Sequence, residues 1–165
     1  MLRPAIDAKA DIPSSLRPKL HLPMSQSAIL LPAVVQALLT MTVLILLGPA
    51  RARSMRAERQ TLGDDDVRVG RNRWSDQALK IANNYKNQFE LPVLFFAVVG
   101  YALILRQGDA LMTGLAWAFV GSRLVHAAIH IGPNVVIWRG AAFLVGAVVL
   151  ATMWLVLGWR IWTGA

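Results

Sequence analysis

Residues 82–105, ANNYKNQFELPVLFFAVVGYALIL, decide the fold of this chain. The first half of the stretch carries three asparagines, a lysine and a glutamate, whereas the second half is apolar enough to enter a bilayer. A helix that begins near Ser75, a suitable N-cap, and runs to residue 105 would be long enough to cross the hydrocarbon core. Pro92 lies inside this segment, so we expect a kink near residues 88–91. The stretch therefore predicts a membrane-spanning helix with one polar, bent half.

Three further apolar runs accompany this one. They cover residues 27–48, 110–131 and 140–162, and each approaches the roughly 20 residues that a transmembrane helix needs. Of the 165 residues, 56% are hydrophobic and 16% are charged, against about 45–50% and about 25% in soluble domains. The predicted fold class is therefore all-α, an integral membrane bundle of four transmembrane helices, in preference to a small soluble helical protein.

The polar segments before and between the runs predict the domain limits and the orientation. Residues 1–26 lack the apolar stretch of a secretory signal and are expected to form a disordered tail, with Met24 as an alternative start of the chain. The transmembrane domain then covers 27–162. The segment 49–74 is expected to be a long polar loop, and a helical first part stays open. It carries seven arginines, whereas the loop after the second span carries only Arg106. By the positive-inside rule, the Arg-rich first loop faces the cytoplasm.

The composition excludes several kinds of site. The chain has no cysteine, which rules out disulfides, zinc–thiolate centres and a cysteine nucleophile. Its formal net charge is +8, a value that would suggest nucleic acid in a soluble protein. Because most of the arginines adjoin apolar spans, the lipid bilayer with its anionic lipids is the simpler partner, and no nucleic-acid partner is expected.

Polar residues inside the spans form two sets with helical spacing. They are Asn83, Asn87 and Glu90 on the second span, and Arg123, His126 and His130 on the third. Each set lies on one helical face, and both lie toward the cytoplasmic ends of their spans. They predict a polar pocket between the two helices that opens toward the cytoplasm. In the structural alternative, Glu90 and Arg123 form a buried ion pair, and the other side chains tie the helices together.

A metal centre is a weaker hypothesis for the same residues. His126 and His130 are four apart, a spacing that metal ligands on a helix use, and Glu90 would be the third ligand. The chain has neither an HExxH motif nor a second histidine cluster. We therefore expect no metal.

The segments ANNYKNQFELPVLFF and GSRLVHAAIHIGPNVVIWR together resemble the MAPEG family, the membrane-associated proteins in eicosanoid and glutathione metabolism. The likeness covers residues 33–162, and its signature is Asn and Glu three apart, then Arg, His and a distal Arg. The resemblance implies a homotrimer of four-helix bundles that binds glutathione as co-substrate between subunits, near the cytoplasmic face. It also implies a small hydrophobic substrate that arrives through the bilayer. The chain looks like a divergent bacterial-type member, which implies the bacterial inner membrane.

Carried over residue by residue, the resemblance implies roles within the pocket. Arg139 would stabilise the glutathione thiolate, because a positive charge beside the sulfur lowers its pKa, and His130 would assist with a proton. Glu90 would hold the ammonium group of glutathione, and Arg51 would meet one of its carboxylates. The implied glutathione-binding residues are Arg51, Lys86, Asn87, Glu90, Arg123 and His126.

The chain also departs from the family pattern. Lys86 and Asn83 stand where several members have arginines, and His130 and Phe143 stand where members have tyrosines. The predicted function is a membrane-bound glutathione-dependent transferase or peroxidase acting on small hydrophobic electrophiles. The alternative is a non-enzymatic membrane protein that keeps the scaffold without the chemistry. A transporter is disfavoured, because the chain has only four spans and no inverted repeat.

Overall fold

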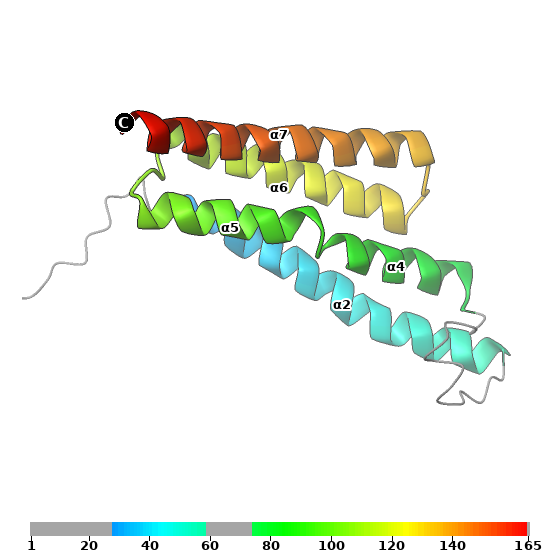
Figure 1. The fold of residues 1–165 in the computed structure, drawn as a ribbon. Coiled ribbons are helices and arrows are strands. Elements are labelled where there is room, and N and C mark those ends of the chain that lie inside the picture. Colours follow the sequence, from blue (N-terminus) through cyan, green and yellow to red (C-terminus); the bar gives the residue numbers. More distant parts are fainter. Residues whose placement is uncertain (1–27, 59–73, 165) are drawn as a thin grey trace, which may run out of the picture.

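The computed structural model describes residues 28–58 and 74–164, and these residues form helices with no strand among them (Figure 1). α6 and α7 lie side by side, α4 and α5 follow one another end to end, and α2 runs beside α4. The all-α prediction is confirmed. The predicted tail at 1–26, with the alternative start at Met24, lies outside the described residues. In chain order the helices are α2 (Leu30–Glu58), α4 (Asp76–Asn87), α5 (Leu91–Ile104), α6 (Ala110–Ile131) and α7 (Val136–Thr163).

Four helical segments in the described part of the chain are long and apolar enough to cross a membrane. Lipid offers no partners to backbone N–H and C=O groups, so a crossing segment must satisfy them within its own helix. The four predicted spans are thus confirmed, and the third has the predicted bounds. The segments are Leu30–Ala57, Asp76–Ile104 (α4 and α5 together), Ala110–Ile131 and Val136–Thr163.

The first helix extends beyond the predicted apolar span, which ends at residue 48, and the helical first part that the sequence left open for the next segment is confirmed. α2 continues through Pro49 to Glu58 and takes in the first arginines of the predicted loop. Arginine and alanine are good helix formers, so the sequence after the proline favours continuation. Hydropathy indicates where a chain leaves the hydrocarbon, and the helix can extend beyond that point.

Contacts with the start of α4 hold this extension of α2 in place. The Ser75 backbone N–H donates to Ser54 Oγ at 2.7 Å, and the Arg51 guanidinium lies 5.5 Å from the centre of the Trp74 ring. Ser75 also caps α4, because its Oγ accepts from the Ala78 N–H at 3.3 Å, and the predicted N-cap is confirmed. The two helices are therefore fixed to each other at the end where the Arg-rich segment joins them.

The second span is interrupted, as its proline predicts. α4 ends at Asn87 and α5 begins at Leu91, with Pro92 in the first turn of α5. A proline in that position removes no hydrogen bond that the helix would otherwise make. The interruption falls on residues 88–90, so the expected kink is confirmed.

A ladder of buried amides spans this interruption. Gln36 Nε2 donates to Gln88 Oε1 at 2.9 Å, Gln88 Nε2 donates to Asn84 Oδ1 at 2.8 Å, and Asn84 Nδ2 donates to the Ala127 backbone carbonyl at 3.1 Å. All three amide side chains are buried. In a membrane bundle such groups find no water, so their bonds to one another join α2, α4 and α6 around the break.

The fourth helix begins earlier than predicted, at Val136 instead of residue 140. Arg139 therefore lies in the first turn of α7. Farther along, a Cβ on Gly146 would lie 2.6 Å from Ser122 Oγ on α6. A larger residue at 146 would force Ser122 to move, so the small residue allows α6 and α7 to pack closely.

Candidate functional site

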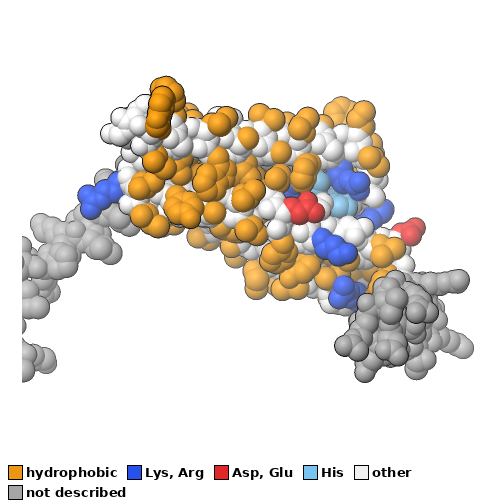
Figure 2. Space-filling view, viewed as in Figure 1, with side chains coloured by type: hydrophobic (Ala, Val, Ile, Leu, Met, Phe, Trp, Pro, Cys, Tyr) orange, Lys and Arg blue, Asp and Glu red, His pale blue; other side chains and the backbone are white. Residues whose placement is uncertain are grey.

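Charged and histidine side chains gather over the α4 half of the face in Figure 2, whereas the α5 half is mostly apolar. Hydrogen bonds join α4, α6 and α7 in this region. Arg123 Nη2 donates to the Asn87 carbonyl at 3.1 Å, and Asn87 Nδ2 lies 3.3 Å from His126 Nε2. His126 Nδ1 lies 3.1 Å from the Arg139 carbonyl. The two predicted polar faces therefore meet, and the start of α7 joins them.

Arg123 is completely buried, although it is a cation in a membrane helix. The last carbonyls of a helix have no partner within it, and α4 ends at Asn87. The bond from Arg123 satisfies the Asn87 carbonyl and places a positive charge at the negative end of the α4 dipole. The Arg123 Nε and Nη1 atoms have no hydrogen-bond partner in the described part of the chain. Arg123 thus satisfies the carbonyl at the end of α4, and two of its nitrogens still lack an acceptor among the described residues.

His126 is held on both sides of its ring. A backbone carbonyl can only accept, so the contact with the Arg139 carbonyl requires the proton on Nδ1. Nε2 then accepts from the Asn87 side-chain amide. These partners specify the neutral ring with its proton on Nδ1. His126 therefore serves here as a link between α4 and α7.

Arg139 lies at the edge of an open hollow of about 320 Å³. Its Nη1 donates to Asn134 Oδ1 at 2.6 Å, in the connection between α6 and α7. His130 also lines the hollow, and its Nδ1 has no hydrogen-bond partner in the described segments. The hollow has the two positive side chains Lys80 and Arg139 and the one carboxylate Asp76. The complete lining is Asp76, Leu79, Lys80, Asn83, His130, Asn134 and Arg139.

The structure does not bring every predicted site residue to the group formed by Asn87, Arg123, His126 and Arg139. Glu90 and Lys86 are exposed on α4 and the break, and Arg51 contacts Trp74 instead. Glu90 makes no hydrogen bond or salt bridge with another described residue. The alternative of a buried Glu90–Arg123 ion pair is therefore wrong, because the carboxylate stays at the surface while the guanidinium bonds to a backbone carbonyl.

Sequence reasoning missed three residues that shape this region. Asn84 and Gln88 are buried, and they occupy the face of α4 next to the predicted stripe. Their spacing of four, together with the lone glutamine Gln36 in the first span, was the available signal. Asn134 follows Gly132 and Pro133, in the short connection between α6 and α7, where no periodic pattern marks it.

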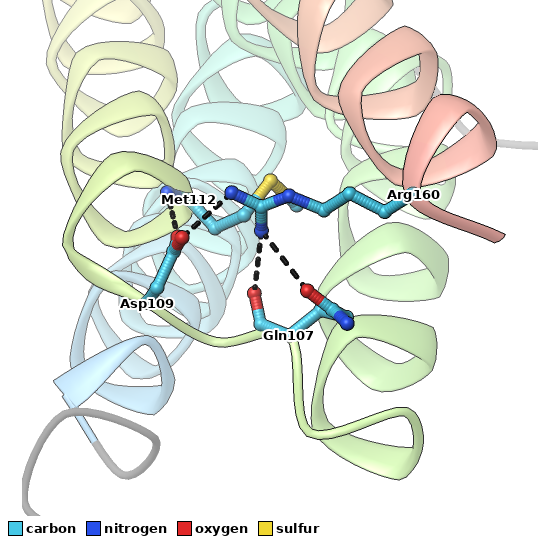
Figure 3. Close-up of polar contacts among 4 residues, drawn as sticks. All are labelled: Gln107, Asp109, Met112 and Arg160. Atoms are coloured by element: carbon cyan, nitrogen blue, oxygen red, sulfur yellow. Dashed lines mark hydrogen bonds and ion pairs between the residues drawn. The ribbon is translucent and has the colours of Figure 1, made fainter. Parts of the chain in front are cut away.

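The opposite end of α7 holds a contrasting arginine (Figure 3). Arg160 Nη2 forms a salt bridge of 2.6 Å with Asp109 Oδ2, and its Nη1 donates to the carbonyl and side-chain oxygens of Gln107 at 3.4 and 3.3 Å. Asp109 caps α6 by accepting from the Met112 N–H at 3.0 Å. Burial by itself raises the pKa of Asp109. The bonds from Arg160 and Met112 outweigh this effect and hold the pKa below its ordinary value.

No group of three or more His, Asp or Glu side chains that could hold a metal ion lies within residues 28–58 and 74–164. The side chains joined by hydrogen bonds here are the cations Arg123 and Arg139, the neutral amides Asn87 and Asn134, and the neutral His126. A guanidinium donates and never accepts, so such a set suits an anionic ligand.

Comparison with known proteins gives a family match. The MAPEG family matches residues 29–159, which is most of the chain and takes in all four membrane-spanning segments nearly complete. No curated protein sequence and no solved structure matches the chain.

Proposed function

The chain belongs to the MAPEG family, and from this premise we propose that it is a membrane-bound glutathione-dependent transferase or peroxidase for small hydrophobic electrophiles. The observation that carries the proposal is the state of Arg139. Arg139 lines the hollow, and its guanidinium bonds to a neutral amide and forms no salt bridge with a described carboxylate. A guanidinium in that state retains its full charge for an anion in the hollow.

Glutathione fits this site chemically. It carries net negative charge and a thiol, and the thiolate is the nucleophilic form. A guanidinium beside the sulfur favours the thiolate, and arginine keeps its charge at any physiological pH. In conjugation the thiolate forms a carbon–sulfur bond to an aryl halide, the halide leaves with its electron pair, and the thiol proton passes to solvent, with His130 as a proposed carrier.

The remaining residues of the proposed glutathione site lie along the same half of the bundle. Asn87, Arg123 and His126 are joined by hydrogen bonds to one another or to the backbone of Arg139. Glu90 and Lys86 are exposed, and an exposed carboxylate can receive the ammonium group of the tripeptide. Arg51 lies against Trp74, so in this proposal it meets a ligand bound to a neighbouring copy.

The proposed assembly and location follow from the same chemistry. Four membrane-spanning segments put the chain in a bilayer, from which an apolar electrophile can arrive directly. We place the Arg-rich first loop in the cytoplasm, where glutathione is available, in the inner membrane of a bacterium. A homotrimer would cover the exposed polar side chains of α4.

Two measurements on the purified wild-type protein in detergent test the proposal. We expect calorimetry to detect glutathione binding at millimolar ligand and an absorbance assay to detect its conjugation to an aryl halide. The matched control is ophthalmic acid, the glutathione analogue without the sulfur, which should bind and give no product. An absence of both binding and conjugation would contradict the proposal.

A second candidate is a MAPEG scaffold without glutathione chemistry. It is favoured by Phe143, which lies 5.7 Å from the Arg123 guanidinium and 5.8 Å from His126, and which offers no hydroxyl to a sulfur. Glu90→Gln separates the two candidates. Loss of oligomers in that variant supports the scaffold, whereas intact oligomers with lost glutathione binding support the site.

A further inference from the structure

We propose that Asn134 is a positioning residue for Arg139. It holds the guanidinium at the edge of the hollow and, because it is a neutral acceptor, it leaves the positive charge available to the reacting sulfur. The inference rests on the proposed function, and it adds a residue that neither the sequence pattern nor the family match assigns to the site.

The backbone at Asn134 is itself fixed. Its φ of 54° lies in the left-handed region, which asparagine and glycine adopt more readily than other residues. Its N–H donates to the Ile129 carbonyl at 2.7 Å, at the end of α6. Gly132 allows the same close turn, since a Cβ there would lie 2.9 Å from the Ala128 carbonyl. These features fix the backbone from which the Asn134 side-chain amide extends.

Arg139 is held at two points from this turn and from α6. Asn134 Oδ1 receives the Arg139 Nη1 bond at 2.6 Å, and the Arg139 carbonyl receives the His126 bond at 3.1 Å. An arginine side chain has many rotamers, and fixing it before the ligand arrives removes part of the ordering cost. The guanidinium would otherwise sample positions away from the hollow.

The charge of the acceptor matters as much as its position. Asp109 and Asn134 both lie 2.6 Å from an arginine nitrogen of α7, yet one is a carboxylate and the other an amide. A carboxylate beside Arg139 would compensate much of its field at the sulfur and would raise the pKa of the bound thiol. The amide gives the same geometry without that compensation.

The other charged and titratable groups around Arg139 come from two packed helices. α4 contributes one acid and one base to the hollow, and α6 contributes the buried cation and both histidines. These groups are Asp76 and Lys80 on α4, and Arg123, His126 and His130 on α6. None of them is substituted when residue 134 changes, so we expect a change in pH profile to report on the new group.

The test uses two substitutions that both tolerate a positive φ. Asn134→Gly keeps the turn and removes the acceptor, so kcat for conjugation should fall between about tenfold and a hundredfold with a smaller change in KM for glutathione. Asn134→Asp keeps the acceptor and adds a negative charge. Its kcat/KM should approach the wild-type value at high pH, with the pH profile shifted up by about one unit.

The control is Thr152→Val, on the exposed side of α7, where the hydroxyl bonds only to the Val148 carbonyl. It should match the wild type in rate, pH profile and melting temperature. The inference is overturned if Asn134→Gly keeps the wild-type kcat, or if Asn134→Asp keeps the wild-type pH profile. If the wild type itself does not conjugate glutathione, the proposed function fails, and the inference fails with it.

Discussion

Each end of α7 carries an arginine, and the two arginines have different kinds of partner: one a carboxylate and the other an amide. Arg160 lies in the last turn, where the helix dipole favours a cation, and it forms a salt bridge with Asp109. Arg139 lies in the first turn, where the dipole of its own helix disfavours a cation, and its side chain bonds only to the amide of Asn134. Stability explains the first arrangement and does not explain the second. The difference supports the role in anion binding that we propose for Arg139.

The largest expected effect separates these two arginines by activity. We predict that Arg139→Ala lowers kcat/KM for glutathione conjugation by at least about a hundredfold, because it removes the charge beside the developing thiolate. Arg160→Ala, the matched control on the same helix, should retain wild-type kcat/KM. Steady-state kinetics on both variants, with size-exclusion chromatography to compare oligomers, gives the measurement.

An equal loss of activity in both variants would contradict the contrast between Arg139 and Arg160. That result would indicate a common effect on folding, which the chromatographic profile and the melting temperature would reveal. Equal activity in Arg139→Ala and wild type would remove Arg139 from the proposed mechanism.

The sequence predicted the membrane spans because hydropathy and helical period are local properties. α6 has the predicted bounds, and Pro92 located the break within a few residues. The sequence leaves the end of α2 open and places the start of α7 too late, because a polar residue such as Arg139 interrupts an apolar run without interrupting the helix. Arg123 and His126 were predicted to meet Asn87 because the spacing and the antiparallel order place them at similar depth.

A single sequence could not show which polar face of α4 packs against the other helices. Two neighbouring polar stripes run along this helix, and helical period alone cannot tell which one packs inward. Asn84 and Gln88 are buried because Gln36 and the Ala127 carbonyl lie opposite them, a tertiary fact. Glu90 remains outside, so its partner in the proposal has to come from a ligand.

A second prediction sharpens the comparison with a polar group that serves the fold. Gln88→Leu should lower the free energy of unfolding by about 1 to 3 kcal/mol, because it leaves the buried amides of Gln36 and Asn84 without their shared partner. Thermal unfolding in detergent measures the loss. The control is Gln77→Leu, an exposed amide whose single bond, to the Ile131 carbonyl, is long at 3.3 Å.

If Gln88→Leu is as stable as the wild type, the amide ladder does not hold the break. If it is destabilised, its kinetic constants with glutathione at low temperature should still resemble those of the wild type. Arg139→Ala should show the reverse combination, with activity lost and stability kept.

A smaller effect is expected at the other end of α7. Arg160→Ala should lower the free energy of unfolding by about 0.5 to 1 kcal/mol, because a partly exposed ion pair contributes little. The side chain of Asp109 is 50% exposed and that of Arg160 is 17% exposed, so solvent screens much of the attraction. The measurement is thermal unfolding at low and high salt, and the difference from wild type should shrink in high salt. A loss that is large and independent of salt would contradict this account.

The smallest effect is the dependence of the Asp109 contact on pH. The pKa of Asp109 in the fold lies below its ordinary value of 3.8. Its carboxylate therefore stabilises the fold above that value, and the contribution is lost as the pH falls through the folded pKa. The difference in unfolding free energy between wild type and Asp109→Asn, about 0.5 kcal/mol at neutral pH, should persist to about pH 5 and disappear in stronger acid. A difference that grows in acid would reverse the sign of this argument. The side-chain acceptor of Arg139 is an amide, which does not titrate, so Asn134→Asp should make this contact of the guanidinium acid-sensitive.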